Sequence, residues 1–149
     1  PTDPGVVRGA VARFLELGID QLVIADTIGA GNPQQVRSLT ADLVHEHGAQ
    51  RLGCHFHDTR AMGLANVYAA IESGVRRFDS SLGGLGGCPF APGAKGNVAT
   101  EDVVMMCEQM GFTTGVDMPA LLAAVELASD LTGYAQGGRA HYWLSNNAA

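Results

Sequence analysis

The sequence contains little positive charge and no long hydrophobic run. Nine of its 149 residues are lysine or arginine, Lys95 is the single lysine, and the formal net charge is −6. Proteins that bind nucleic acid neutralise phosphates with clustered basic side chains, which this composition does not supply. A membrane-spanning helix needs about 20 consecutive apolar residues, and no segment approaches that length. We therefore expect neither nucleic acid nor a membrane among the partners.

Cysteine is also scarce. The three cysteines, Cys54, Cys88 and Cys107, are widely spaced, and no two of them form a CxxC pair. An odd and dispersed set of this kind indicates neither a disulfide framework nor a cysteine-rich zinc site. Residues 1–14 lack the apolar core of a signal peptide. These features favour the reducing cytoplasm as the location.

The hydrophobic pattern predicts helices and strands that alternate along the chain. Apolar residues recur at helical spacing in some segments, and short apolar runs typical of buried parallel strands separate them. Asn32 before Pro33, and Asp117 before Pro119, are typical helix starts. Helices are expected over residues 4–17, 33–47, 61–72, 100–110 and 117–131, and strands over residues 21–25, 51–56 and 75–80. Residues 133–149 show no periodicity, and we expect a poorly ordered tail there.

This alternation predicts an α/β fold with a parallel sheet and right-handed crossovers. The chain supplies three strands, whereas a complete (β/α)₈ barrel needs about 250 residues. Two interpretations follow, a part of such a barrel and a small three-stranded sheet. Open strand edges invite pairing with further strands, which favours the partial barrel.

Polar residues follow each predicted strand, at the edge where α/β proteins place their ligands. They are Asp26-Thr27, His55 to Thr59, and Asp79-Ser80-Ser81. His55 and His57 are two residues apart on a strand, so both imidazoles point to one face. Two such imidazoles can bind one divalent metal ion, or can be satisfied by neighbouring carboxylates. Asp58 could orient an imidazole, but a cap of the next helix is the favoured interpretation.

A glycine-rich segment follows the third strand. Six glycines lie within residues 83–97, and Cys88 lies among them. Such a segment can approach a ligand closely or close over it. Cys88 could be an acid/base group or nucleophile, or an incidental thiol, and Asn97 a metal ligand or a turn residue. Glu101 and Asp102 occupy a predicted helix N-terminus, where acidic side chains complement the helix dipole.

Four motifs together resemble those of the 3-hydroxy-3-methylglutaryl-CoA lyases, metal-dependent enzymes with a TIM-barrel fold. In chain order they are Asp26-Thr27-Ile28-Gly29, His55-Phe56-His57-Asp58-Thr59, Gly84-Leu85-Gly86-Gly87-Cys88-Pro89-Phe90 and Gly96-Asn97-Val98-Ala99-Thr100-Glu101-Asp102. The resemblance implies that residues 1–132 form the C-terminal half of a (β/α)₈ barrel. An aspartate that follows an arginine on the family's first strand, and that also binds the metal, has no counterpart here.

The same resemblance implies a set of functional residues. The metal ligands would be His55, His57 and Asn97, and the cofactor Mg²⁺ or Mn²⁺. The catalytic groups would be His55 in proton transfer, Cys88 as the loop thiol, and Asp26, Glu101 and Asp102 in support.

The reaction implied is cleavage of 3-hydroxy-3-methylglutaryl-CoA, or a close 3-hydroxyacyl-CoA, to acetyl-CoA and acetoacetate by retro-Claisen chemistry. Two alternatives remain open: an acetyl-CoA-dependent synthase of the same superfamily, and a non-catalytic half-barrel that binds metal or associates with itself. The resemblance also implies a homo-oligomer. Because the arginine–aspartate pair is missing, we expect the 149-residue chain alone to be inactive.

Overall fold

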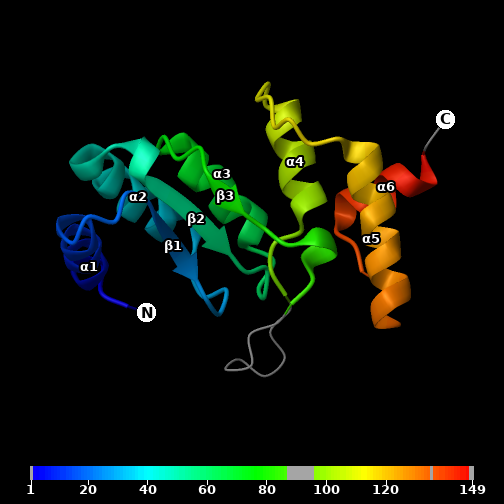
Figure 1. Ribbon diagram of the computed structural model, residues 1–149, viewed down its shortest axis with the longest axis horizontal. Helices are drawn as coiled ribbons and strands as arrows, with labels where there is room; N and C mark the ends of the chain where they lie inside the picture. The colour runs from blue at the N-terminus through cyan, green and yellow to red at the C-terminus, as the bar shows by residue number, and fades with distance from the viewer. Residues whose placement is uncertain (1, 87–95, 135, 148–149) are drawn as a thin grey trace. The chain divides into compact units, whose positions relative to one another are not determined.

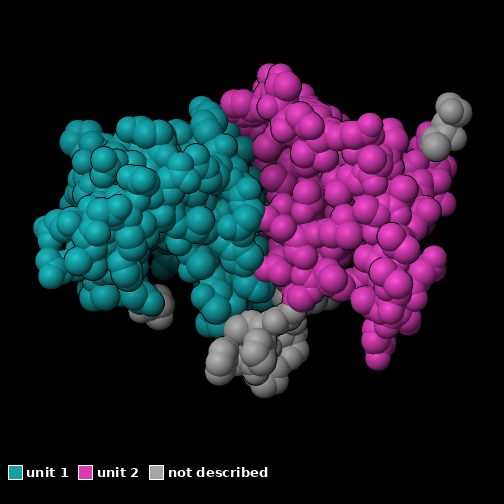
Figure 2. All heavy atoms as spheres, in the orientation of Figure 1, with its two compact units in different colours: residues 1–79 teal, residues 80–149 magenta. Residues whose placement is uncertain are grey.

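A computed structural model describes residues 2–86, 96–134 and 136–147 of the chain. The chain divides into two compact units, Pro1–Asp79 and Ser80–Ala149 (Figure 2). The first unit contains, in order, α1 (Pro4–Glu16), β1 (Leu22–Asp26), α2 (Pro33–His47), the 3₁₀ turn η1 (Ala49–Arg51), β2 (Leu52–Phe56), α3 (Gly63–Glu72) and β3 (Phe78–Asp79). The second contains η2 (Leu82–Gly84), α4 (Thr100–Gln109), α5 (Met118–Thr132) and α6 (Arg139–Asn146).

The three strands form a parallel sheet in the order β1-β2-β3, as the sequence predicts (Figure 1). Ile24 is level with Cys54 across the first pair, and Cys54 is level with Phe78 across the second. Strand β3 is shorter than predicted. The Val75 N–H bonds to the carbonyl of Ala70 and so continues the end of α3 instead of joining the ladder.

The helix starts predicted at Asn32 and Asp117 are confirmed. Asn32 and Gln35 form a reciprocal capping box at α2, and the Asp117 carboxylate accepts the Ala120 N–H at 2.9 Å at the start of α5. Helix α3 begins at Gly63, two residues later than predicted. The carboxylate of Asp58 accepts the Gly63 N–H at 2.7 Å, which confirms the favoured interpretation of Asp58 as a helix-start residue.

Helices α1 and α2 pack on one face of the sheet. Val11 of α1, Leu43 of α2 and Leu52 of β2 form the buried cluster, and Leu22 and Ile24 of β1 pack against it. On the other face of β1, Val23 is 48 % exposed. The sheet therefore has one face covered by α1 and α2, and a second face that is open at β1.

Residues 139–146 form helix α6, which the sequence did not predict. The N-terminus of this helix is capped by carboxylates of α4, distant in the sequence, so the tail itself carries no local start signal. Among the described residues, none of the helices has the length and apolar character needed to cross a membrane.

Truncating the centre of the buried cluster tests this packing. Leu43 is fully buried, so Leu43→Ala should lower the free energy of unfolding by about 2–5 kcal/mol through lost burial and a residual cavity. Leu131→Ala is the matched control, because that side chain is 77 % exposed and should cost under about 0.5 kcal/mol. Urea denaturation followed by far-UV circular dichroism measures both. Equal costs in the two variants would contradict the assigned core.

Candidate metal centre

His55 and His57 project from the same face at the end of β2. Their ring centroids are 5.0 Å apart, with an angle of 71° between the planes. The alternate residues Cys54 and Phe56 are buried on the helix-covered face, at 1 % and 3 % exposure. The strand pleat therefore separates an apolar row from a pair of imidazoles, as the sequence predicts.

Both imidazoles use Nδ1 to bond a neighbour within the first unit. His57 Nδ1 lies 3.0 Å from the backbone carbonyl oxygen of Asp26, and His55 Nδ1 bonds the carboxylate of Asp79. A carbonyl oxygen only accepts hydrogen bonds, so the proton of His57 is on Nδ1 and the lone pair is on Nε2. A carboxylate partner favours the same tautomer for His55. No hydrogen bond to either Nε2 occurs within the described part of the chain.

This arrangement is the one that metal-binding histidines show. A ligating imidazole usually donates its other N–H to a carboxylate or a backbone carbonyl, which fixes the ring and raises its basicity. Here His55 has the carboxylate partner and His57 the carbonyl partner. The alternative interpretation of the sequence is that neighbouring carboxylates satisfy both histidines. It holds for Nδ1 of His55, while no described residue bonds either Nε2 atom.

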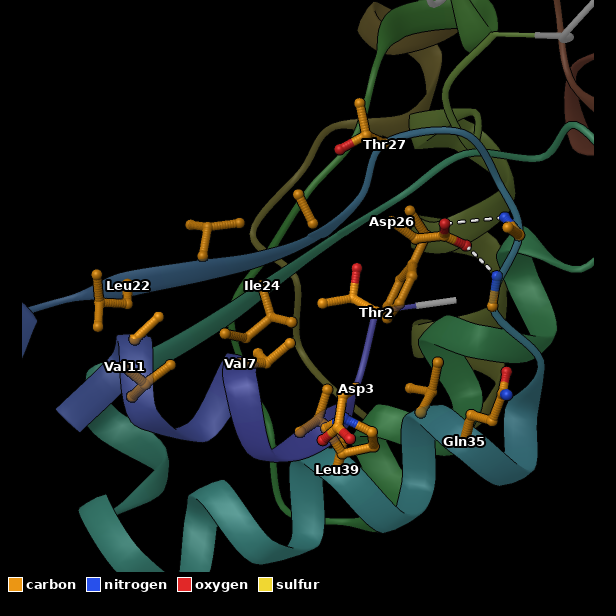
Figure 3. A pocket seen from close by; sticks show the side chains of 18 of the residues that line it. Thr2, Asp3, Val7, Val11, Leu22, Ile24, Asp26, Thr27, Gln35 and Leu39 are labelled. Carbon is orange, nitrogen blue, oxygen red and sulfur yellow. Dashed lines mark hydrogen bonds between the residues drawn. The ribbon is translucent and has the colours of Figure 1, made fainter. Parts of the chain in front are cut away.

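The Asp26 side chain holds the loop that follows β1. Its two carboxylate oxygens accept the N–H groups of Ala30 at 2.9 Å and Gly31 at 2.8 Å (Figure 3). The carbonyl of Gly31 in turn accepts from Asn66 Nδ2 at 3.2 Å. The backbone carbonyl of Asp26 thus orients His57. A catalytic role for the Asp26 carboxylate stays a prediction.

Asn97 carries an unpaired buried oxygen. Its Nδ2 donates to the carbonyl of Leu85 at 2.9 Å, while its Oδ1 is buried with no hydrogen-bond partner among the described residues. Buried polar atoms without a partner are rare, and an amide oxygen is a suitable ligand for Mg²⁺ or Mn²⁺. Asn97 belongs to the second unit and the histidine pair to the first.

The described residues contain no group of three or more histidine, cysteine, aspartate or glutamate side chains that could hold a metal ion. The free Nε2 atoms of His55 and His57 and the unpaired Oδ1 of Asn97 fit a divalent cation in their donor chemistry. As ligands, all three stay a prediction.

The two acidic residues at the start of α4 accept hydrogen bonds from backbone N–H groups. Glu101 is fully buried, and its carboxylate accepts N–H groups from Gly83 at 3.1 Å and Gly138 at 2.6 Å. Asp102 accepts from Arg139 at 3.2 Å and Ala140 at 2.6 Å. These contacts explain the acidic pair structurally, and a catalytic role for either residue stays a prediction. Cys88 lies outside the described residues.

A separate cavity of about 890 Å³ lies along β1, between α1 and α2 (Figure 3). Val7, Phe14 and Leu39 line it together with residues of β1, while His55 and His57 do not. The candidate metal centre and this apolar cavity are therefore distinct features of the first unit.

Sequence reasoning did not single out Asp79 as a functional residue. The contact between its carboxylate and His55 fixes the tautomer of a candidate ligand. The available signal was its place at the end of a strand, level with His55 in the parallel ladder. That register depends on how the strands pair, so only the structure reveals this partner.

Fold and site together define a class: an α/β chain of barrel-type βα units, with an imidazole pair suited to a divalent metal where β2 ends. The comparisons specify the family. A family model described as HMGL-like matches residues 1–128. The chain belongs to this family of TIM-barrel proteins, and its three-stranded sheet is a part of such a barrel.

Curated relatives and solved structures agree with this assignment. The chain is 47 % identical over 128 residues to hydroxymethylglutaryl-CoA lyase YngG of Bacillus subtilis, covering 86 % of this chain and 42 % of that protein. It is 42 % identical over 146 residues to hydroxymethylglutaryl-CoA lyase of Pseudomonas mevalonii, covering 98 % and 48 %. The crystal structure of hydroxymethylglutaryl-CoA lyase from Pseudomonas aeruginosa matches with a TM-score of 0.91 and 40 % identity, over 97 % of this chain and 48 % of that one. The chain thus spans less than half the length of these relatives.

Burial of Cys54 predicts its reactivity. Removal from water, with a smaller effect of the Asp79 charge, raises the pKa of the Cys54 thiol to about 12. At pH 8 the reactive thiolate is then about a thousandfold rarer than for a thiol of pKa 9. Iodoacetamide should therefore modify Cys54 only when urea unfolds the chain. Peptide mass spectrometry measures the labelling, and rapid labelling of Cys54 in the folded chain would contradict its assigned burial.

The donor set predicts metal binding by the purified chain. Mn²⁺ titration calorimetry should detect binding in the natural sequence and much weaker binding after His55→Ala or His57→Ala. Asp79→Asn should weaken binding by about 10–100-fold, because the orienting carboxylate is lost. The exposed His45 supplies the control, and His45→Ala should leave the affinity unchanged. Equal affinities in the His55, His57 and His45 variants would exclude the pair as ligands.

Proposed function

We propose that this chain supplies the metal- and thiol-bearing half of a carbon–carbon lyase, which cleaves 3-hydroxy-3-methylglutaryl-CoA or a close 3-hydroxyacyl-CoA. One observation carries the proposal: both imidazoles at the end of β2 are oriented through Nδ1, and neither Nε2 has a hydrogen-bond partner among the described residues. Relatives at 42–47 % identity are named hydroxymethylglutaryl-CoA lyases, which supports the same reaction here.

The ligands in this proposal are His55 Nε2, His57 Nε2 and Asn97 Oδ1. A divalent cation bound there would stabilise the developing alkoxide of the substrate's tertiary hydroxyl, an effect worth several kcal/mol. Imidazole ligands favour Mn²⁺ over Mg²⁺.

The cleavage needs a base and an acid. The base takes the hydroxyl proton, the oxygen lone pair becomes the new carbonyl bond, and the bond to the thioester's α-carbon breaks. Its electron pair passes to the thioester enolate, which Cys88 protonates at carbon. Acetyl-CoA and acetoacetate leave, and the proton taken from the hydroxyl returns to the Cys88 sulfur.

His55 is the proposed base, and the structure limits how it can act. Its Nδ1 is engaged by Asp79, so a proton can arrive only at Nε2, the same atom that is proposed to bind the metal. In this proposal His55 would hold the cation before the proton transfer, and His57 Nε2 and Asn97 Oδ1 would hold it while His55 Nε2 carries the proton. When Nε2 takes the proton, the Asp79 carboxylate stabilises the resulting imidazolium. Asp26, Glu101 and Asp102 support the site in this proposal by holding the surrounding loops.

Two alternatives differ in what they require. A synthase would run the carbon–carbon chemistry in reverse, and the lyase names of the relatives do not favour it. A non-catalytic half-barrel would bind metal or a second copy without turnover. The proposed acyl-CoA substrate and homo-oligomer rest on the family likeness alone, and the proposed cytoplasmic location rests on the few, dispersed cysteines.

A chimera tests the lyase function. The 128 residues that align with the Bacillus subtilis lyase would replace the matching segment of that enzyme, which supplies the remaining length. We expect the chimera to form acetyl-CoA and acetoacetate, and the 149-residue chain alone to form neither. Coupled assays of both products measure this.

Variants of the chimera identify the groups. Cys88→Ala and His55→Ala should each reduce kcat by at least about a hundredfold, as expected for acid–base groups. His45→Ala is the matched control on an exposed helix position and should retain activity. A folded chimera that binds Mn²⁺ but gives no turnover would contradict the lyase proposal and favour the non-catalytic alternative.

A further inference from the structure

Two stretches of the second unit, residues 83–86 and 96–99, lie against each other at the two ends of the glycine-rich segment. We call this pair of stretches the neck. The Asn97 side chain donates to the Leu85 carbonyl at 2.9 Å across this neck. A Cβ atom at Gly96 would overlap the carbonyl oxygens of Gly84 and Gly86. The backbone of residues 84–86 therefore determines where Asn97 lies.

Gly83, at the base of the neck, is fixed from two sides. Its N–H donates to the Glu101 carboxylate at 3.1 Å, and its carbonyl accepts the Gly137 N–H at 3.2 Å. It has a φ of +60°, and a Cβ atom there would lie 2.8 Å from Cβ of Gln136. The C-terminal tail thus packs directly against the base of the neck.

The tail is held in turn by α4. Glu101 accepts the Gly138 N–H at 2.6 Å, while Asp102 accepts the Arg139 and Ala140 N–H groups. Helix α6 has no side-chain cap of its own, so these carboxylates satisfy its first donors. Hydrogen bonds with one ionised partner are about twice as strong as neutral ones. The fully buried Glu101 therefore links Gly83 and the tail through a single carboxylate.

We propose that residues 136–146 are a positioning segment, which docks on Glu101 and Asp102 and thereby fixes the neck and the orientation of Asn97. The hydrogen bonds of Glu101 and Asp102 support the docking. Its effect on a metal site rests on the proposed function, so docking and metal binding are measured separately.

Gly138→Ala tests the docking. The backbone of Gly138 (φ −78°, ψ −173°) is accessible to alanine, but the new Cβ would overlap the Asp102 carboxylate and displace it from the α6 N-terminus. We expect amide hydrogen exchange at Gly83 to accelerate at least about tenfold, together with exchange at Arg139 and Ala140. Asp102→Ala should give the same pattern without added bulk.

Gly9→Ala is the matched control. Gly9 lies in α1, where a Cβ atom meets nothing within 4 Å, so exchange at Gly83 should be unchanged. If the amides of α6 exchange faster in Gly138→Ala and Asp102→Ala while Gly83 keeps its protection, the tail does not position the neck. That result would overturn the proposal.

Mn²⁺ affinity measures the effect on Asn97. Gly138→Ala should weaken binding in the natural sequence and have no further effect in the Asn97→Ala background, because both changes act through one ligand. Additive losses would show a general structural effect and overturn the link to Asn97. If Asn97→Ala alone leaves the affinity unchanged, the proposed ligand fails, while the exchange at Gly83 still decides the docking.

Discussion

Successive side chains along strand β2 point to opposite faces of the sheet, and the candidate site depends on that alternation of faces. Leu52, Cys54 and Phe56 are buried on the helix-covered face of the sheet. His55 and His57 therefore point to the opposite face, with their rings 5.0 Å apart. A shift of one residue in strand pairing would exchange the faces and place both imidazoles in the apolar core. The packing of Leu52 against α1 and α2 thus also fixes the register of the candidate ligands.

The partners of the two imidazoles give the pair its chemical character. Each Nδ1 is engaged, one by the Asp26 carbonyl and one by the Asp79 carboxylate, and each Nε2 keeps its lone pair. Asp26 contributes through two groups: its backbone carbonyl orients His57, and its carboxylate holds the β1–α2 loop. In the second unit, Glu101 similarly engages backbone donors on two segments. Within each unit, carboxylates and carbonyls thus fix the local groups by hydrogen bonds.

The sequence predicts most of the fold, because its signals are local. Caps at Asn32 and Asp117, together with the helical and strand periods, locate the main helices and all three strands. Helix α6 is missed because its cap comes from Asp102, 37 and 38 residues earlier in the chain than the donors it satisfies. The face shared by His55 and His57 follows from the strand period alone. The Asp79 partner does not, since it depends on the pairing of β2 with β3.

The coordination of Mn²⁺ by imidazole nitrogen is the most direct test of the central claim. Electron spin-echo envelope modulation of the Mn²⁺-loaded chain, labelled with ¹⁵N only at histidine, detects nitrogen bound to the metal. The account predicts coupling to two histidine nitrogens in the natural sequence, and to one nitrogen after either His55→Ala or His57→Ala. Mn²⁺ bound without any histidine coupling would contradict it, because the ion would then lie elsewhere on the chain.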